Sequence, residues 1–164
     1  MEAGARQYRF QRLDTAGLVE QVVADFEPQI AGSGRHIELT PPGSVCPVEA
    51  DPEALSVALR NLVDNALKYS PNCATVWVDW SVVDHQVAIR VRDQGAGIPP
   101  AEQKAIFRKF VRGSAAAAGN VRGSGVGLAM VRHIVLAHGG EVRVTSQPGE
   151  GSTFTMLLPA AENL

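Results

Sequence analysis

The amino-acid sequence predicts an α+β fold, a two-layer sandwich in which three main helices cover one face of a mixed, mostly antiparallel β-sheet. Three features of the chain support this prediction. Apolar residues recur every three or four positions in some segments and alternate with polar residues in other, shorter segments. Turn residues, chiefly glycine and proline, separate these segments. Helices and strands mixed in this order are typical of a two-layer sandwich.

The first third of the chain is expected to contain one helix and three short strands. Residues 1–7 are small and polar and are interpreted as a linker remnant, so the single domain is placed at residues 8–160, with a tail at 161–164. Asp14 and Thr15 are favourable N-cap residues for an amphipathic helix that we expect to continue to about residue 31. Alternating polarity predicts strands at residues 8–13, 36–40 and 45–49.

The most strongly patterned stretch is residues 52–70, for which a long helix is predicted. Asp51-Pro52-Glu53 is a typical helix start, and Ser70-Pro71-Asn72 is a typical end. The apolar residues of this stretch fall on one helical face, which we expect to pack against the sheet. They are Leu55, Leu59, Leu62, Val63 and Ala66.

The second half of the chain predicts two antiparallel hairpins on either side of a glycine-rich region. The first joins residues 75–83 to 86–92 through Asp84-His85, and the second joins residues 141–146 to 152–158. Between the hairpins we expect a short helix at residues 101–107 and a mobile loop rich in glycine and alanine. A further helix is predicted at residues 126–138, where Gly139-Gly140 ends it.

Composition excludes several classes of protein. The 164 residues carry a formal net charge of −2, which gives no overall attraction to nucleic acid or to membrane surfaces. Cys46 and Cys73 lack metal-ligand spacing and are interpreted as free thiols in a reducing compartment. No apolar run is long enough to span a bilayer, and no signal peptide opens the chain. These features predict a cytoplasmic domain.

A polar stripe runs beside the apolar face of the long helix. Asn61, Asn65 and Lys68 recur at helical spacing and therefore project side by side. Amide oxygens suit a hard cation such as Mg²⁺, and an ammonium suits a phosphate. The alternative is an ordinary solvated face of an amphipathic helix.

A carboxylate followed by closely spaced glycines comes directly after a predicted strand, at residues 93–99. Asp93 offers only hydrogen-bond acceptors, and Gly95 and Gly97 let the backbone pass close to a flat ligand. Adenine presents an amine donor to such a carboxylate, whereas guanine presents a carbonyl oxygen. The alternative is a simple Asp-x-Gly turn.

A second glycine cluster opens the helix predicted at residues 126–138. Its exposed backbone N–H groups and the helix N-terminus favour phosphate binding. The spacing matches neither the dinucleotide-binding fingerprint nor the P-loop. Lys109 and Arg112 precede it and are either triphosphate contacts or solvated charges. The cluster comprises Gly123, Ser124, Gly125, Val126, Gly127 and Leu128.

Taken together, these segments resemble the four nucleotide-binding blocks of the catalytic domain of sensor histidine kinases. The blocks correspond, in order, to residues 61–69, 93–97, 107–110 and 123–128. That domain belongs to the superfamily shared with DNA gyrase and the mismatch-repair ATPases. The resemblance extends from about residue 8 to residue 159 and implies the Bergerat ATP-binding sandwich, with ATP and Mg²⁺ as cofactors.

The resemblance also implies roles for individual residues. Asn65 would hold Mg²⁺ directly, and Asn61 would hold it directly or through water. Lys68 and Tyr69 would approach the phosphates, and Asp93 would recognise adenine. Residues 111–125 would form a flexible lid over ATP. The remaining residues assigned to nucleotide binding are Gly95, Gly97, Ile98, Phe110, Arg112, Gly123, Ser124, Gly125, Val126, Gly127 and Leu128.

The resemblance further implies a catalytic domain that phosphorylates a histidine outside it. Gyrase-like ATPases resemble one another in having a glutamate at the position of Asn61, and an amide cannot act as a general base. His36 superficially resembles an acceptor histidine, but its segment alternates like a strand. The implied partners are a helical dimerisation and phospho-acceptor domain and a response regulator, and not nucleic acid. The isolated domain is expected to be a monomer belonging to a membrane-anchored parent.

Two other functions fit the same residues. One is a stand-alone ATPase or a serine kinase of the same superfamily, which would turn over ATP without a histidine acceptor. The other is a non-catalytic nucleotide-sensing module. The complete set of Asn61, Asn65 and Asp93 favours the catalytic alternatives over this last one.

Overall fold

The computed structural model describes residues 7–70, 74–108 and 127–161. The strands are β1 (Gln11–Asp14), β2 (His36–Thr40), β3 (Pro47–Ala50), β4 (Thr75–Val83), β5 (Gln86–Arg92), β6 (Glu141–Gln147) and β7 (Gly151–Pro159). The helices are α1 (Thr15–Ala24), α2 (Glu27–Ile30), α3 (Pro52–Tyr69) and α5 (Gly127–Ala137). Two short 3-10 turns, η2 (Pro100–Glu102) and η3 (Ala105–Phe107), lie between β5 and α5.

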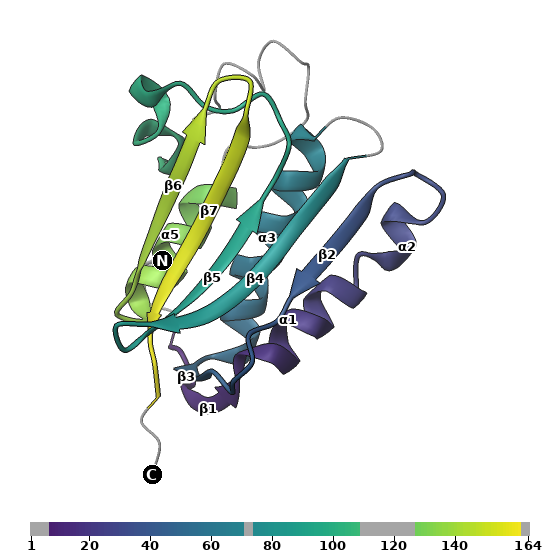
Figure 1. The fold of residues 1–164 in the computed structure, drawn as a ribbon. Helices are drawn as coiled ribbons and strands as arrows, with labels where there is room; N and C mark the ends of the chain where they lie inside the picture. Colours follow the sequence, from purple (N-terminus) through teal and green to yellow (C-terminus); the bar gives the residue numbers. More distant parts are fainter. Residues whose placement is uncertain (1–6, 71–73, 109–126, 162–164) are drawn as a thin grey trace.

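The described elements form two layers, as Figure 1 shows. A five-stranded sheet has the order β2-β4-β5-β7-β6, and β1 pairs with β3 in a small separate sheet. In the large sheet β2 and β4 are parallel, and the other neighbours are antiparallel. Helices α1, α3 and α5 lie on one face of this sheet (Figure 1). The predicted sandwich is therefore confirmed.

Both predicted hairpins are present in the described residues. The first, between β4 and β5, turns at Asp84 and His85, which have φ angles of 51° and 63°. Two successive residues in the left-handed region match the twist of the flanking strands, as in a type I′ turn. The second hairpin pairs β6 with β7 from Glu141 opposite Leu157 to Gln147 opposite Gly151.

The N-terminal helix differs from the prediction. It was expected to run unbroken to about residue 31, but α1 ends at Ala24 and α2 begins at Glu27. Pro28 has no backbone N–H and cannot donate to a carbonyl four residues earlier, so a single helix would lose a hydrogen bond here. Asp14 makes no side-chain capping bond; instead, the Thr15 hydroxyl donates to the carbonyl of Cys46 at 2.6 Å.

Two further segments are shorter than expected. The strand predicted at residues 8–13 is limited to β1, and the short helix predicted at residues 101–107 is replaced by η2 and η3. In both cases the pattern placed an element correctly but overestimated its regularity.

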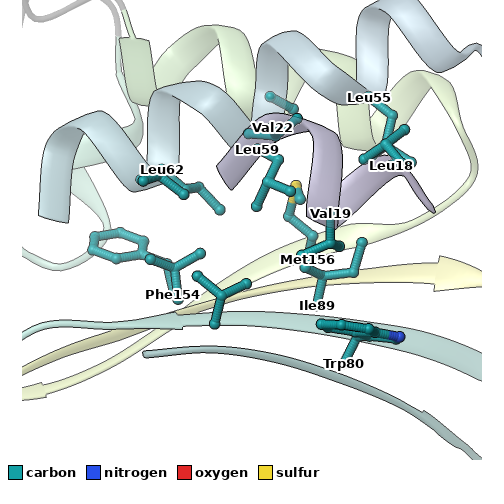
Figure 2. Close-up of a cluster of buried hydrophobic side chains, with 14 of the residues drawn as sticks. Leu18, Val19, Val22, Leu55, Leu59, Leu62, Trp80, Ile89, Phe154 and Met156 are labelled. Carbon is teal, nitrogen blue, oxygen red and sulfur yellow. The ribbon is translucent and has the colours of Figure 1, made fainter. Parts of the chain in front are cut away.

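The helix at the centre of the chain begins and ends as predicted. The Asp51 side chain accepts a hydrogen bond from the backbone N–H of Ala54 at 3.1 Å and so caps α3. All five residues of the predicted apolar face are at most 2% exposed. Figure 2 shows Leu55, Leu59 and Leu62 facing the sheet residues Ile89, Phe154 and Met156. This packing anchors the helix that carries the polar stripe beside its apolar face.

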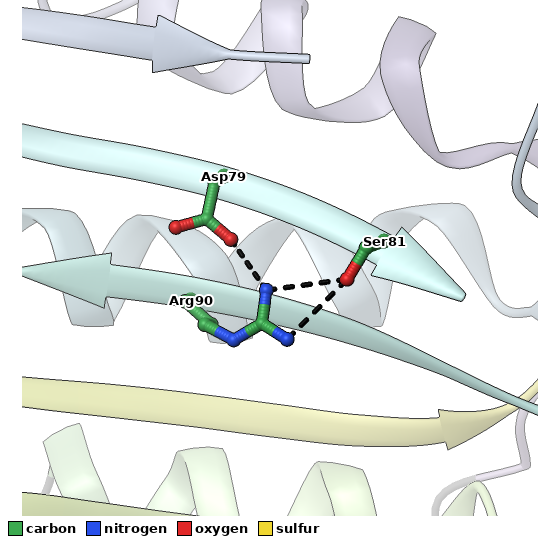
Figure 3. Close-up of polar contacts among 3 residues, drawn as sticks. All are labelled: Asp79, Ser81 and Arg90. Carbon is green, nitrogen blue, oxygen red and sulfur yellow. Dashed lines mark hydrogen bonds and ion pairs between the residues drawn. The ribbon is translucent and has the colours of Figure 1, made fainter. Parts of the chain in front are cut away.

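The other face of the sheet carries a cluster of polar and charged side chains. Asp79 and Ser81 of β4 and Arg90 of β5 meet there, with Arg90 donating to both partners (Figure 3). The ion pair between Arg90 and Asp79 is 2.5 Å long and about one third exposed, so it stabilises the fold only slightly.

The four histidines and Cys46 all lie within the described residues, in different elements of the fold. His36 lies in β2, which excludes the helical acceptor motif, and His85 lies in the hairpin turn. His133 is exposed on α5, whereas His138 is buried just after it. Cys46 is a buried free thiol whose pKa is raised by burial and by the charge of Asp14. Cys73 lies outside the described residues.

Candidate functional site

The polar stripe lies on the second half of α3. The Asn61 side-chain nitrogen donates to the carbonyl of Val57 at 2.8 Å, and no hydrogen bond to its Oδ1 is found among the described residues. Asn65 is half-buried and makes no hydrogen bond to the described residues. Lys68 forms an exposed ion pair with Asp64, with Nζ and Oδ2 3.0 Å apart. The stripe therefore presents two amide oxygens and one loosely held ammonium.

Asp93 is a buried carboxylate at the end of β5, only 6% exposed. Its Oδ1 accepts hydrogen bonds from the backbone N–H groups of Gly95 at 2.8 Å and Ser152 at 3.1 Å. Burial raises the pKa of this carboxyl, and the two backbone hydrogen bonds partly oppose that rise. No hydrogen bond to Oδ2 is found among the described residues, so this oxygen is available to accept from a ligand donor.

The loop after Asp93 is bound to the β6–β7 turn through its backbone. Gly97 has a φ angle of +80°, and a β-carbon there would lie 2.0 Å from the carbonyl oxygen of Gln147. The N–H of Gly149 donates to the carbonyl of Ala96, and the N–H of Ile98 donates to the Ser146 hydroxyl at 2.7 Å. The close approach of a flat ligand at these glycines stays a prediction; at Gly97 the neighbouring backbone of the β6–β7 turn also requires a residue without a β-carbon.

The same loop also contacts the end of α3. A β-carbon on Gly95 would lie 2.6 Å from the carbonyl oxygen of Tyr69, so only glycine fits there without a shift. At the other side of the stripe, a β-carbon on Gly127 would lie 3.1 Å from Oδ1 of Asn61. The structure thus brings three separate predicted segments, around Asp93, along α3 and at the start of α5, to one end of the molecule.

The other residues singled out from the sequence either pack against the core or lie outside the described residues. Ile98, Phe107 and Leu128 are partly buried against the hydrophobic core, and the Phe107 ring packs edge-on against Phe154 with centroids 6.0 Å apart. The predicted core role of Phe107 is consistent with this packing. The remaining candidates lie outside the described residues: Lys109, Phe110, Arg112, Gly123, Ser124, Gly125 and Val126.

Four residues that hold the Asp93 loop were not identified from the sequence. Ser152 bonds Asp93, and Ser146 bonds Ile98. Gln103 donates to the carbonyls of Ile98 and Ser146, both at 3.0 Å, and Gln94 accepts from the backbone N–H of Thr75 at 2.9 Å. The sequence contains no signal for them, because each contact joins residues distant in the chain or unremarkable in type.

A groove of about 350 Å³ lies beside the stripe, between the α1–α2 junction and α3. Asp93 does not line it, and among the predicted site residues it includes only Asn61. Its residues are Asp25, Phe26, Gln29, Val57, Arg60, Asn61 and Asp64. The groove is therefore distinct from the site around Asp93.

The donor set suits Mg²⁺ better than a transition metal. No cluster of three or more histidine, cysteine, aspartate or glutamate side chains that could hold a metal occurs in the part of the chain that the structure describes. Neutral amide oxygens, as on Asn61 and Asn65, suit a hard cation that brings phosphate oxygens with it. These residues fit a nucleotide-bound Mg²⁺ rather than a dedicated metal centre.

A two-layer α+β sandwich that carries a buried carboxylate near a helix with two amides and a lysine has the features expected of a nucleotide-binding domain. The family model described as "Histidine kinase-, DNA gyrase B-, and HSP90-like ATPase" matches residues 50–162. The chain belongs to this family.

Two relatives that match most of this chain are named as histidine kinases. The sensor-like histidine kinase SenX3 of Mycobacterium tuberculosis (strain H37Rv) is 41% identical over 149 residues, 90% of this chain and 36% of the relative. The sensor histidine kinase CusS of Escherichia coli (strain K12) is 41% identical over 138 residues, 84% of this chain and 28% of the relative. The chain thus spans about a third of the length of the curated relatives that it matches.

Solved structures have the same fold. The mycobacterial sensor histidine kinase MprB superimposes with a TM-score of 0.80 at 29% identity, over 94% of this chain and all of that chain. Full-length ShkA in complex with AMPPNP gives a TM-score of 0.85 at 29% identity, over 97% of this chain and 33% of ShkA. These neighbours agree with the Bergerat sandwich that the resemblance implied.

Proposed function

We propose that this chain is the catalytic domain of a sensor histidine kinase, which binds ATP with Mg²⁺ and transfers the γ-phosphoryl group to a histidine on a separate helical domain. The main support is the environment of Asp93, a buried carboxylate whose Oδ2 has no partner among the described residues. Its position suits the exocyclic amine of adenine, and guanine would place a carbonyl oxygen against it. The AMPPNP bound to ShkA is an adenine nucleotide and supports the same choice.

At the phosphate end, α3 supplies the groups that hold the triphosphate. Asn61 and Asn65 would present amide oxygens to Mg²⁺, and Lys68 would exchange Asp64 for a phosphate oxygen. The metal ion, when bound, neutralises the charge that develops on the transferred group. Neither amide can deprotonate water, so this end of the site positions ATP without activating a hydrolytic attack.

The nucleophile would then be an imidazole supplied by the acceptor domain. Catalysis would depend on aligning the imidazole with the γ-phosphate and on neutralising the charge of the phosphates. Together these two effects are sufficient for phosphoryl transfer. The relatives named above are all sensor kinases, which favours this function over a stand-alone ATPase or a serine kinase. A response regulator is the proposed downstream partner, and the cytoplasm is the proposed location. No helix in the described part of the chain has the length and apolarity needed to cross a bilayer.

The test is phosphotransfer from γ-labelled ATP to purified candidate acceptor domains. We expect label on the acceptor that is lost in acid and retained in base, as for phosphohistidine, and almost no free phosphate from the isolated chain. At ATP concentrations below saturation, Asp93→Asn should lower the transfer strongly, because it weakens ATP binding. Asp79→Asn, on the polar face of the sheet, is the matched control and should retain it. Rapid release of phosphate without an acceptor would reject the proposal in favour of an ATPase.

A further inference from the structure

The two helices that border the candidate site, α3 and α5, are in contact at both ends of α5. At the start of α5, a β-carbon on Gly127 would lie only 3.1 Å from Oδ1 of Asn61, which is near the middle of α3. At the other end, the backbone N–H of Asp51, just before α3, donates to Nε2 of His138, just after α5, at 3.1 Å. The helices are therefore antiparallel, and the two contacts are about 15 Å apart along α3.

His138 is buried, 7% exposed, and both nitrogens of its ring are used. Because Nε2 accepts from the Asp51 N–H, the ring proton must be on Nδ1, which then donates to the carbonyl of Ile134 at 2.8 Å. The imidazole is thus held as a single neutral tautomer between the last turn of α5 and the start of α3. This arrangement leaves no ring nitrogen for proton transfer or metal binding.

Asp51 joins three parts of the chain. Its Oδ1 caps α3 through Ala54, its N–H bonds His138, and its Oδ2 accepts from the backbone N–H of Arg9 at 3.0 Å. The neighbouring rings of Tyr8 and Phe10 pack edge-on against the His138 imidazole, with centroids 5.4 and 4.8 Å away. The N-terminal segment therefore covers the contact between the two helices.

We propose that Asp51 and His138 are positioning residues for the nucleotide site. Their hydrogen bond fixes the position of α5 along the axis of α3. It thereby keeps Gly127 close to Asn61 at the phosphate end of the site. The inference rests on the proposed function of that end of the site. A shift of α5 along α3 would move the start of α5 relative to the amides, although neither His138 nor Asp51 touches the nucleotide.

The test compares His138→Phe with His138→Gln in the full chain. Phenylalanine keeps an aromatic ring among Tyr8 and Phe10 but cannot accept from the Asp51 N–H, whereas the glutamine amide oxygen can. With all variants fully folded, calorimetry with an ATP analogue should show affinity reduced about 3- to 30-fold in His138→Phe and largely restored in His138→Gln. If His138→Phe does not fold, His138→Leu is the second variant without an acceptor.

A matched control separates positioning from simple destabilisation. Ile37 is a buried residue of β2, at the edge of the sheet. Ile37→Ala should therefore lower the melting temperature without changing nucleotide affinity. The NMR signals of the Asn61 side-chain amide give a second readout and should move in His138→Phe but not in Ile37→Ala. Unchanged affinity or an unmoved Asn61 signal in His138→Phe would overturn the proposal. If the wild-type chain bound no nucleotide, the proposed function would fail, and the Asn61 signal would still decide the role of His138.

Discussion

The carbonyl oxygen of Tyr69 lies so close to Gly95 that a β-carbon on Gly95 would be 2.6 Å from it. Tyr69 is the last residue of α3, and Gly95 belongs to the loop that starts at Asp93. This contact holds the loop that follows Asp93 against the C-terminal end of α3. In the proposed function, the distance between the amide stripe and the buried carboxylate must match the separation of adenine from the phosphates.

We therefore expect Gly95→Ala to weaken ATP binding by at least about tenfold, because backbone cannot yield as a flexible side chain does and the loop must move away from α3. Calorimetric titration with an ATP analogue measures the effect. Gly17→Ala is the control, since nothing lies within 4 Å of a β-carbon there and it falls within α1. That control should keep full affinity and gain about 1 kcal/mol of stability. Equal affinities for Gly95→Ala and wild type would contradict this account of the loop.

Asp93→Asn should separate binding from folding. The asparagine oxygen can still accept from Gly95 and Ser152, so the melting temperature should change little. Its amide nitrogen, however, is a donor and would lie opposite the donor amine of adenine. The loss of a hydrogen bond to a charged group costs about 1.5–3 kcal/mol, or roughly 10- to 150-fold in affinity. Calorimetry and thermal unfolding of the same preparations test both statements. A variant that binds ATP as wild type does would remove Asp93 from the adenine site.

The raised pKa of Asp93 predicts opposite effects of pH on stability and on binding. Because burial raises the pKa of this carboxyl in the folded state, its contribution to folding is most favourable below the unfolded-state pKa and is lost as the pH rises through the folded-state pKa. Binding requires the ionised carboxylate, so ATP affinity should fall as the pH is lowered through that raised pKa.

The pH dependence is measured as the difference between wild type and Asp93→Asn. From neutral pH down to about pH 4, wild type should gain stability relative to the variant and lose its advantage in ATP affinity. A difference in stability or affinity that stays constant over this range would show that Asp93 does not titrate as proposed.

Local patterns explain why much of the fold was predictable. The cap at Asp51, the apolar face of α3 and the paired left-handed residues Asp84 and His85 each act within a few residues of chain. The prediction was wrong where it gave too little weight to a local rule: Pro28 cannot donate a backbone hydrogen bond inside the unbroken helix that the apolar spacing suggested, and the chain forms α1 and α2 instead.

The support of the candidate site was not predictable, because it depends on contacts between distant residues. Gly97 and Gln147 are fifty residues apart in sequence, yet their backbones touch, and Ser152 bonds Asp93 across a similar separation. Nothing in the spacing of either segment indicates its partner. The residue types of the site, such as Asp93 and Asn61, carry a chemical signal, whereas the backbone contacts that hold them do not.

Lys68 provides a test of the phosphate end. Its ion pair with Asp64 joins residues four apart on an exposed helix face, and such a pair contributes only about 0.3–0.5 kcal/mol. Lys68→Met should therefore leave the melting temperature nearly unchanged, but it should lower phosphotransfer at least about tenfold, because the ammonium no longer reaches the phosphates. Asp64→Asn breaks the same ion pair while keeping the lysine, and it should transfer phosphate at nearly the wild-type rate. Equal losses of phosphotransfer in the two variants would show that the ion pair itself, and not a phosphate contact by Lys68, is what the site requires.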